Sequence, residues 1–262
     1  DRDWWRSALG DPAALLKQPT CKDSHSAAVA IAALEAGRAR LEVVVKRPLA
    51  RNAQRRIRQL FPPSRARRGW RIGHALLNRN IPAAMPLALL ERRAGPFVLD
   101  QMLVTELIPD ALDLPRHFQR ERADRSRRSW SRHKRALAEA IGRFVRTLHD
   151  RGFVHRDCKA ENILVAPGPR LYWIDFDGIR LRRRVGRADR LAAMARLHVS
   201  LLDSPYVSIT DRARCLRAYY RGFGRDPRAW RDAWRRLAPL VARKVRQREA
   251  RRAWKRAHYG RE

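Results

Sequence analysis

Two short polar runs constrain this chain of 262 residues more than any other feature. The first is His155-Arg156-Asp157-Cys158-Lys159-Ala160-Glu161-Asn162, and the second, Asp175-Phe176-Asp177-Gly178, begins thirteen residues after Asn162. The apolar stretches between them, 163–165 and 171–174, are short and rich in residues that favour strands. Acidic, amide and ammonium side chains therefore lie just before and just after a predicted pair of strands. Such a set of groups is suited to a ligand that carries charge and a metal ion.

The first run has the pattern H-R-D-x-x-x-x-N of the catalytic loop in protein-kinase-like phosphotransferases, and the second stands where those enzymes have D-F-G. The pattern predicts that Asp157 accepts the proton of an acceptor hydroxyl and that Lys159 offsets charge on the transferred phosphate. Asn162 and Asp175 are the predicted Mg²⁺ ligands. Asp177 replaces the glycine of D-F-G, so it could bind metal or substrate, or cap the next segment.

A lysine at the end of a β-branched run is the predicted clamp for the α- and β-phosphates of ATP. That run is Leu41-Glu42-Val43-Val44-Val45-Lys46. The usual partner of this lysine is a glutamate on the following helix, but there is no Asp or Glu between Lys46 and Glu91. Another residue must orient Lys46, or the nucleotide and metal do so. No glycine-rich loop precedes Lys46. The candidate for the loop that covers the phosphates is 21–26, in which Ser24 and Ser26 would lie near phosphate; alternatively, 21–26 is an ordinary hairpin turn.

The remaining pattern predicts an α+β, bilobal, protein-kinase-like fold. Residues 1–105 form a small strand-rich lobe, 106–109 a hinge from which Glu106 and Ile108 contact the nucleotide, and 110–262 a mainly helical lobe. In the first lobe we expect a helix over 64–77, capped by Ser64, and strands over 87–92 and 97–107. In the second, an apolar stripe from Leu137 to Leu148 predicts a helix that ends at Gly152.

Further helices are expected over 189–202 and after Asp226-Pro227, which would provide an N-cap and a first-turn proline. The segment 116–135 is dense in arginine and is expected to be an exposed loop or helix. Asp189 would cap its helix or fix the backbone of the catalytic loop, and His155 would support that loop. Cys158 stands beside Asp157, but no His/Asn relay accompanies it, which disfavours a nucleophilic role.

The composition bears on partners and on location. The formal net charge of +33 favours polyanions such as nucleic acid, anionic lipid or phosphorylated glycolipid, although a bias toward arginine codons would produce it too. No apolar run reaches the length of a membrane-spanning helix, and the N-terminus does not read as a signal peptide. Three scattered cysteines suggest reduced thiols and a cytoplasmic setting.

The chain resembles the lipopolysaccharide core kinases. The resemblance is carried by 148–158, by 174–180 and by 187–201, and it extends over about 46–222. It implies ATP and Mg²⁺ as cofactors and Kdo or heptose of the lipopolysaccharide inner core as acceptor. The H-R-D-C run is closer to the heptose kinases, and I-D-F-D-G followed by arginine is closer to the Kdo kinases. A peripheral location at the inner face of the inner membrane follows, with the basic segments 116–135 and 243–256 against lipid A and its anionic surface.

Two other interpretations remain open. A kinase of the same fold could act on a protein or on another small molecule, although no A-P-E motif follows Asp175. Alternatively, the chain could be a pseudokinase or a basic binding scaffold. Nucleic acid is not expected as a partner, because Lys46, Asp157, Asn162 and Asp175 are all present and no nucleic-acid-binding motif is found.

Overall fold

The computed structural model describes residues 2–11, 15, 20–24, 27–49, 61, 63–221 and 228–259. Contacts between Cα atoms divide the chain into two compact units. Unit 1 comprises Asp1–Pro109 together with Asp175–Asp177, and unit 2 comprises Asp110–Ile174 together with Gly178–Glu262. The second polar run of the sequence thus contributes three residues to the unit formed by the first part of the chain.

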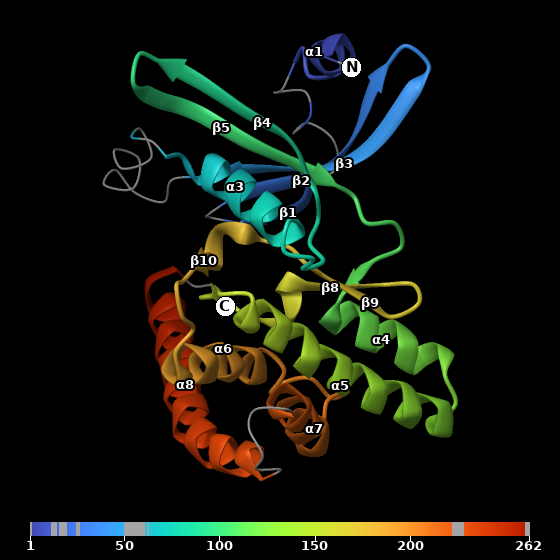
Figure 1. Cartoon of the computed structure of the whole chain (residues 1–262), viewed down its shortest axis with the longest axis vertical. Helices are drawn as coiled ribbons and strands as arrows, with labels where there is room; N and C mark the ends of the chain where they lie inside the picture. The colour runs from blue at the N-terminus through green and yellow to red at the C-terminus, as the bar shows by residue number, and fades with distance from the viewer. Residues whose placement is uncertain are drawn as a thin grey trace. The chain divides into compact units, whose positions relative to one another are not determined.

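Unit 1 is built on an antiparallel sheet of five strands in the order β1-β2-β3-β5-β4 (Figure 1). The strands are β1 (Thr20–Ser24), β2 (Ala27–Ala36), β3 (Ala39–Pro48), β4 (Pro86–Ala94) and β5 (Phe97–Glu106), and the helices are α1 (Arg2–Ala8) and α3 (Arg65–Leu77). Val43 and Val45 of β3 are fully buried, whereas Val44 between them is not, as the two-residue period of a strand requires. Gly95, with φ +54°, lies in the turn that joins β4 to β5. The strands expected over 41–46, 87–92 and 97–107 are confirmed.

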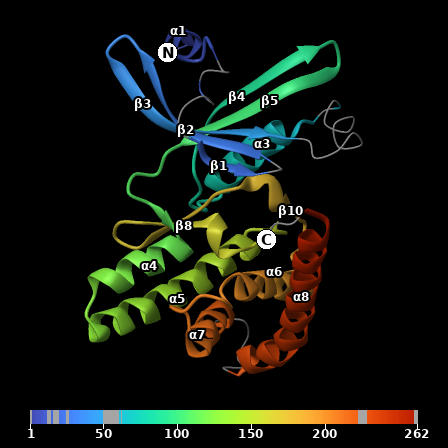
Figure 2. The ribbon, with the colours of Figure 1, turned by 180° about the vertical axis from the view of Figure 1, so that it is seen from behind.

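Helix α3 runs along the sheet of unit 1 (Figures 1 and 2). As expected, Ser64 caps it: the Ser64 hydroxyl accepts the N–H of Arg67 at 3.0 Å. Gly69 and Gly73 lie on its buried face, where a Cβ atom on Gly73 would come within 2.4 Å of Pro86 and 2.9 Å of Phe176. The helix can therefore approach the sheet and Phe176 closely only because this position lacks a side chain.

Unit 2 is mainly helical. Its helices are α4 (Leu114–Asp124), α5 (Arg127–Asp150), α6 (Arg187–Ser200), α7 (Ile209–Tyr220) and α8 (Ala229–Tyr259). Two small antiparallel sheets accompany them, β6-β8-β9 and β10-β7. Their strands are β6 (Leu112–Asp113), β7 (Phe153–His155), β8 (Ile163–Ala166), β9 (Arg170–Trp173) and β10 (Ile179–Leu181). The short helices η2 (Ala160–Asn162) and η3 (Phe176–Gly178) form the ends of the two polar runs.

The core of unit 2 lies between α5 and the elements packed on it. Trp173 of β9 is fully buried, and its ring stacks on that of Phe144 at 4.9 Å between centroids. A Cβ atom at Gly142 of α5 would come within 2.2 Å of the Cys215 carbonyl oxygen in α7, so this glycine permits the close contact of the two helices. Figure 2 shows α6 beside α8 as well, in agreement with their many contacts.

Most helices of unit 2 agree with expectation, but two points differ, and one expectation falls outside the described residues. The segment 116–135 is helical, yet the idea that it is exposed throughout is wrong, because Phe118 and Trp130 are buried and their rings meet edge to face. A few apolar residues on the inward side of a helix are sufficient for burial, even where the rest of the helix is rich in arginine. Helix α7 was not expected, and Asp226-Pro227 lies outside the described residues. Gly152 follows α5 with φ +83°, as expected. No helix in the described part of the chain is apolar over the length that a membrane crossing needs.

Candidate functional site

The loop that carries the first polar run is held at its base by His155. This histidine ends β7 and is fully buried. Its Nδ1 atom accepts the backbone N–H of Asp157 at 3.2 Å, and the Arg156 N–H donates to the Gly178 carbonyl oxygen at 2.8 Å. A Cβ atom on Gly178 would lie 2.8 Å from His155 Nδ1, so the chain can pass this close directly before β10 only with glycine. His155 thus supports the loop, as the sequence suggested.

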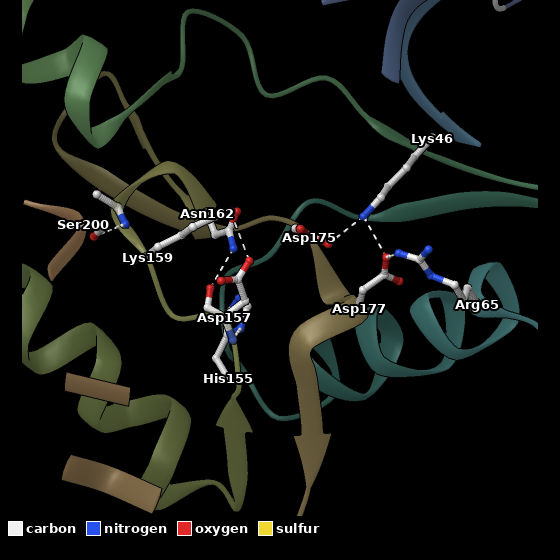
Figure 3. A network of polar contacts seen from close by, with 10 residues as sticks. Lys46, Arg65, His155, Asp157, Lys159, Asn162, Asp175, Asp177 and Ser200 are labelled. Carbon is white, nitrogen blue, oxygen red and sulfur yellow. Dashed lines mark hydrogen bonds and ion pairs between the residues drawn. The ribbon is translucent and has the colours of Figure 1, made fainter. Parts of the chain in front are cut away.

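Three predicted site residues meet within this loop (Figure 3). The Lys159 ammonium lies 3.1 Å from Asp157 Oδ2, and the side chain of Asp157 is 53% exposed. Asn162 is buried, and its Nδ2 atom donates to the Asp157 carbonyl oxygen at 2.8 Å. The backbone of Asp157 is therefore fixed from both sides, by His155 and by Asn162, while its carboxylate remains open to a ligand. The Asn162 carbonyl oxygen accepts the N–H of Ile174 at 3.1 Å, which connects the loop to the end of β9.

A further support of the loop was not found from the sequence. The N–H of Ala160, which is fully buried, donates to the Ser200 hydroxyl at 2.9 Å. That hydroxyl, which is drawn in Figure 3, donates to the Leu197 carbonyl oxygen at 2.8 Å. Ser200 is the last residue of α6, whereas the sequence suggested Asp189 for this function. Asp189 lies in the first turn of α6, and the cap of that helix is Gly186. A serine forty residues from its partner gives no local signal in the sequence.

In unit 1, Lys46 is bound by both aspartates of the second run. Its Nζ atom lies 2.6 Å from Asp175 Oδ1 and 3.1 Å from Asp177 Oδ2 (Figure 3). Burial opposes the charge of Lys46, but the fields of Asp177 and Asp175 outweigh it and raise the pKa of the ammonium. The alternative left open by the missing helix glutamate is thereby answered: the carboxylates of Asp175, the predicted metal ligand, and of Asp177 orient this lysine.

Asp177 has a second partner, Arg65. The Arg65 Nη2 atom lies 2.6 Å from Asp177 Oδ2, the same oxygen that contacts Lys46. Arg65 is the first residue of α3, the helix on which a glutamate was sought. The sequence gives no signal for this contact, because the usual partner on this helix is an acid and here the helix provides a cation. The segment around Asp177 is fixed further by Phe176, which is buried against Gly73 of α3.

Asp175 has φ +60°, a left-handed conformation that residues with a side chain adopt rarely. This conformation costs on the order of 1 kcal/mol outside glycine, and such positions concentrate at functional sites. The carboxylate of Asp175 is held by Lys46 and the next residue is anchored by the burial of Phe176. The contacts of the segment therefore maintain a backbone shape that the residue itself disfavours.

The other predicted nucleotide contacts are described only in part. Glu106 ends β5, and its Oε1 atom accepts the N–H of Met85 at 2.8 Å; Ile108 is buried. The backbone of Ser24 lies in β1, which pairs with β2 as the predicted hairpin requires, but its side chain is outside the described part. Ser26 lies outside the described residues altogether. Burial raises the pKa of the Cys158 thiol to about 12, which agrees with the view that it is no nucleophile.

The chemistry of these donors suits a divalent metal ion in each unit separately. In unit 1, Asp175 and Asp177 already stabilise two positive charges, and carboxylate oxygens are the ligands that Mg²⁺ prefers. In unit 2, Asn162 uses its amide nitrogen for the loop, so its oxygen is the atom suited to a cation. A different cluster, His117, Glu121 and His133, has its ligand atoms within 4.8 Å of one another, but the two imidazoles are hydrogen-bonded at 3.0 Å and Glu121 pairs with Arg125. These contacts account for the cluster without a metal.

The solved structure of WaaP in complex with acyl carrier protein is similar to this chain. The TM-score is 0.61, with 24% sequence identity, over 94% of this chain and 95% of that one. A sheet that carries Lys46, a helical unit that carries an H-R-D-x-x-x-x-N loop and this likeness define a protein of the protein-kinase-like fold.

The family model described as the lipopolysaccharide kinase (Kdo/WaaP) family matches residues 37–220, and the chain belongs to that family. It is 31% identical over 172 residues to the lipopolysaccharide core heptose(I) kinase WaaP of Pseudomonas aeruginosa, which is 62% of this chain and 61% of that protein. It is 30% identical over 167 residues to the 3-deoxy-D-manno-octulosonic acid kinase of Xylella fastidiosa, 64% of this chain and 59% of that protein. The chain thus spans about 60% of the length of these curated relatives.

Proposed function

We propose that this protein is an ATP- and Mg²⁺-dependent kinase that transfers the γ-phosphate to a sugar hydroxyl, that of Kdo or heptose in the lipopolysaccharide inner core. The observation that carries the proposal is that Asp157 has a fixed backbone and an accessible carboxylate. Its backbone is fixed by His155 and Asn162, its carboxylate is half exposed, and Lys159 lies beside it. A base that must accept a proton from an incoming hydroxyl needs this combination of rigidity and access. The family assignment supports the same chemistry.

Each residue then has a defined task. Asp157 orients the acceptor hydroxyl and takes its proton as the new P–O bond forms and the bond to ADP breaks. Lys159 offsets the negative charge on the transferred group. Lys46 binds the α- and β-phosphates, and Asn162 and Asp175 hold Mg²⁺, which would neutralise phosphate charge when bound.

The rest of the nucleotide site would come from the segment after β5 and from the β1–β2 hairpin. Segment 106–109 would serve as the hinge between the lobes 1–105 and 110–262, with Glu106 and Ile108 near the base of ATP. Ser24 and Ser26 of the β1–β2 hairpin would lie near its phosphates. The support is the placement of Glu106 at the end of β5 and the pairing of β1 with β2.

The acceptor would bring the protein to a membrane. Inner-core sugars are attached to lipid A, so we propose a cytoplasmic protein that is peripheral at the inner face of the inner membrane. The net charge of +33 supports this, as do the exposed arginines of α8 within 243–256, which are Arg243, Arg246, Arg251, Arg252 and Arg256. Helix α4 and the start of α5 can contribute arginines also, although Phe118 and Trp130 there face the core.

Transfer of γ-labelled phosphate from ATP to purified inner-core lipopolysaccharide tests the proposal. Asp157→Asn keeps the shape of the side chain and removes the base, so label on the glycolipid should disappear while calorimetric binding of Mg-ATP persists. Asp124→Asn, at an exposed aspartate of α4, is the matched control and should transfer normally. Sugar analysis of the labelled product separates Kdo from heptose. Transfer to a generic protein but not to glycolipid would refute the acceptor, and no transfer to any acceptor would refute the kinase function.

A further inference from the structure

Lys46, the proposed phosphate clamp, does not receive its acidic partner from the helix that provides it in other proteins of this fold. In the usual arrangement the helix after the lysine strand provides an acid for the lysine. Here the first residue of that helix is a cation, Arg65, and the acid comes from the loop, as Asp177. A single oxygen, Asp177 Oδ2, lies 2.6 Å from Arg65 Nη2 and 3.1 Å from Lys46 Nζ (Figure 3).

We propose that Arg65 is a positioning residue for nucleotide binding, which acts on Lys46 through Asp177. This inference rests on the proposed function, and it gives Asp177 a task other than that of a metal ligand. Arg65 holds the Asp177 carboxylate on one side, and the carboxylate then holds the Lys46 ammonium on the other. Two of these four groups, Lys46 and Arg65, are cations and two, Asp175 and Asp177, are anions, so their own charges sum to zero.

The start of α3 is fixed firmly enough for this task. The Ser64 hydroxyl donates to Glu91 Oε1 at 2.6 Å, and the Ala66 N–H donates to Gln101 Oε1 at 2.7 Å. Glu91 belongs to β4 and Gln101 to β5, so the residues on both sides of Arg65 are bound to the sheet that also carries Lys46. The side chain of Arg65 is 24% exposed, which leaves its guanidinium partly shielded from water.

The same helix holds the loop at a second point. Phe176, the residue before Asp177, is 4% exposed, and Gly73 of α3 provides the space for its ring. Arg65 and Gly73 are eight positions apart on α3, about two turns, so they lie on one face of the helix. The helix therefore holds the Asp175–Asp177 segment by an apolar contact and by an ion pair. The carboxylate of that ion pair also contacts Lys46. An acid at position 65 would instead repel Asp177.

A double-mutant cycle of Arg65→Ala and Asp177→Asn tests whether Arg65 acts through Asp177. The affinity for Mg-ATP is measured by calorimetry with a non-hydrolysable analogue. Loss of a charge-assisted hydrogen bond predicts a drop of roughly tenfold for each single variant. Because both variants break the same chain of contacts, the double variant should be no more than about twofold weaker than Asp177→Asn alone. Arg65→Lys keeps the charge and should recover part of the affinity that Arg65→Ala loses. In Arg65→Ala, KM for ATP should rise by a larger factor than that by which kcat falls.

The controls separate this role from general damage and from the proposed function. Arg71→Ala removes an exposed arginine of the same helix and should bind as the wild type does. The cycle is repeated on the free energy of unfolding without nucleotide, where Arg65 and Asp177 should again be coupled. The role of Arg65 would be overturned by any of three results. The losses of affinity in the two single variants could multiply in the double variant, or Arg65→Ala could bind Mg-ATP as tightly as the wild type. The third result is that the two residues show no coupling in the free energy of unfolding. Coupling in unfolding with no binding of Mg-ATP by the wild type would instead refute the proposed kinase function, and with it the nucleotide role of Arg65.

Discussion

Ser200→Ala is the change that most directly tests how α6 supports the catalytic loop. The variant removes the acceptor of the Ala160 N–H, which is fully buried, and the 2.9 Å hydrogen bond with it. A buried N–H left without a partner costs about 1–3 kcal/mol. The change also removes the hydrogen bond from the hydroxyl to the Leu197 carbonyl oxygen, which is one of the last four carbonyls of α6. Alanine is a better helix former than serine by roughly half a kcal/mol, which offsets part of the loss. We expect a net destabilisation of about 1–2 kcal/mol.

The consequence for activity follows from the position of Ala160 between Lys159 and Asn162. Loosening of this turn should displace both neighbours, so kcat should fall roughly tenfold, while binding of ATP changes less. Urea unfolding gives the stability, and phosphate transfer gives kcat. Ser131→Ala in α5 is the matched control in the same unit. Unchanged stability together with unchanged kcat would refute the reasoning, because it would mean that the N–H of Ala160 needs no acceptor from α6.

Three further predictions concern stability, thiol chemistry and membrane binding. Hydrogen bonds from its arginine and serine partners hold the pKa of Glu91 at about 2, below its usual value of 4.5, so its contribution is present above pH 4.5 and is lost as pH falls toward 2. The pKa difference corresponds to at most about 3 kcal/mol, and in Glu91→Gln the acid-side loss of stability should be smaller by this amount in urea titrations at several pH values. Cys158, with its thiol pKa raised to about 12 by burial, should resist alkylation in the native protein and react only in denaturant; fast native labelling, located by peptide mass, would contradict its burial. Replacement of three basic residues of α8 by glutamine should weaken co-sedimentation with anionic vesicles and leave kinetics on a soluble acceptor unchanged, and unaltered sedimentation would remove this helix from the membrane proposal; the three are Arg243, Lys244 and Arg246.

The fold of this protein could be predicted largely from patterns that act over a few residues. Alternation of buried valines predicts β3, an apolar stripe predicts α5, and Ser64 and Gly152 mark the cap of one helix and the end of another. These signals are local because hydrogen bonds and side-chain period within one element are local. Helix α7 escaped prediction, since its burial depends on contact with α5 at Gly142 and not on a strong stripe of its own.

Some residues of the candidate site can likewise be predicted from local patterns, and others depend on contacts between distant parts of the chain. The spacing of Asp157, Lys159 and Asn162 can be read from the sequence, because all three lie on one short loop whose backbone holds them together.

Only the tertiary structure shows what orients the site. Lys46 and Asp175 are 129 positions apart, and Arg65 and Asp177 are 112 apart, so no local pattern connects either pair. The sequence by itself thus determined which chemical groups are present and on which elements. Packing of α3 on the sheet, and of Phe176 on α3, decided which charges meet, because ion pairs over such separations form only where the folded core places their backbones.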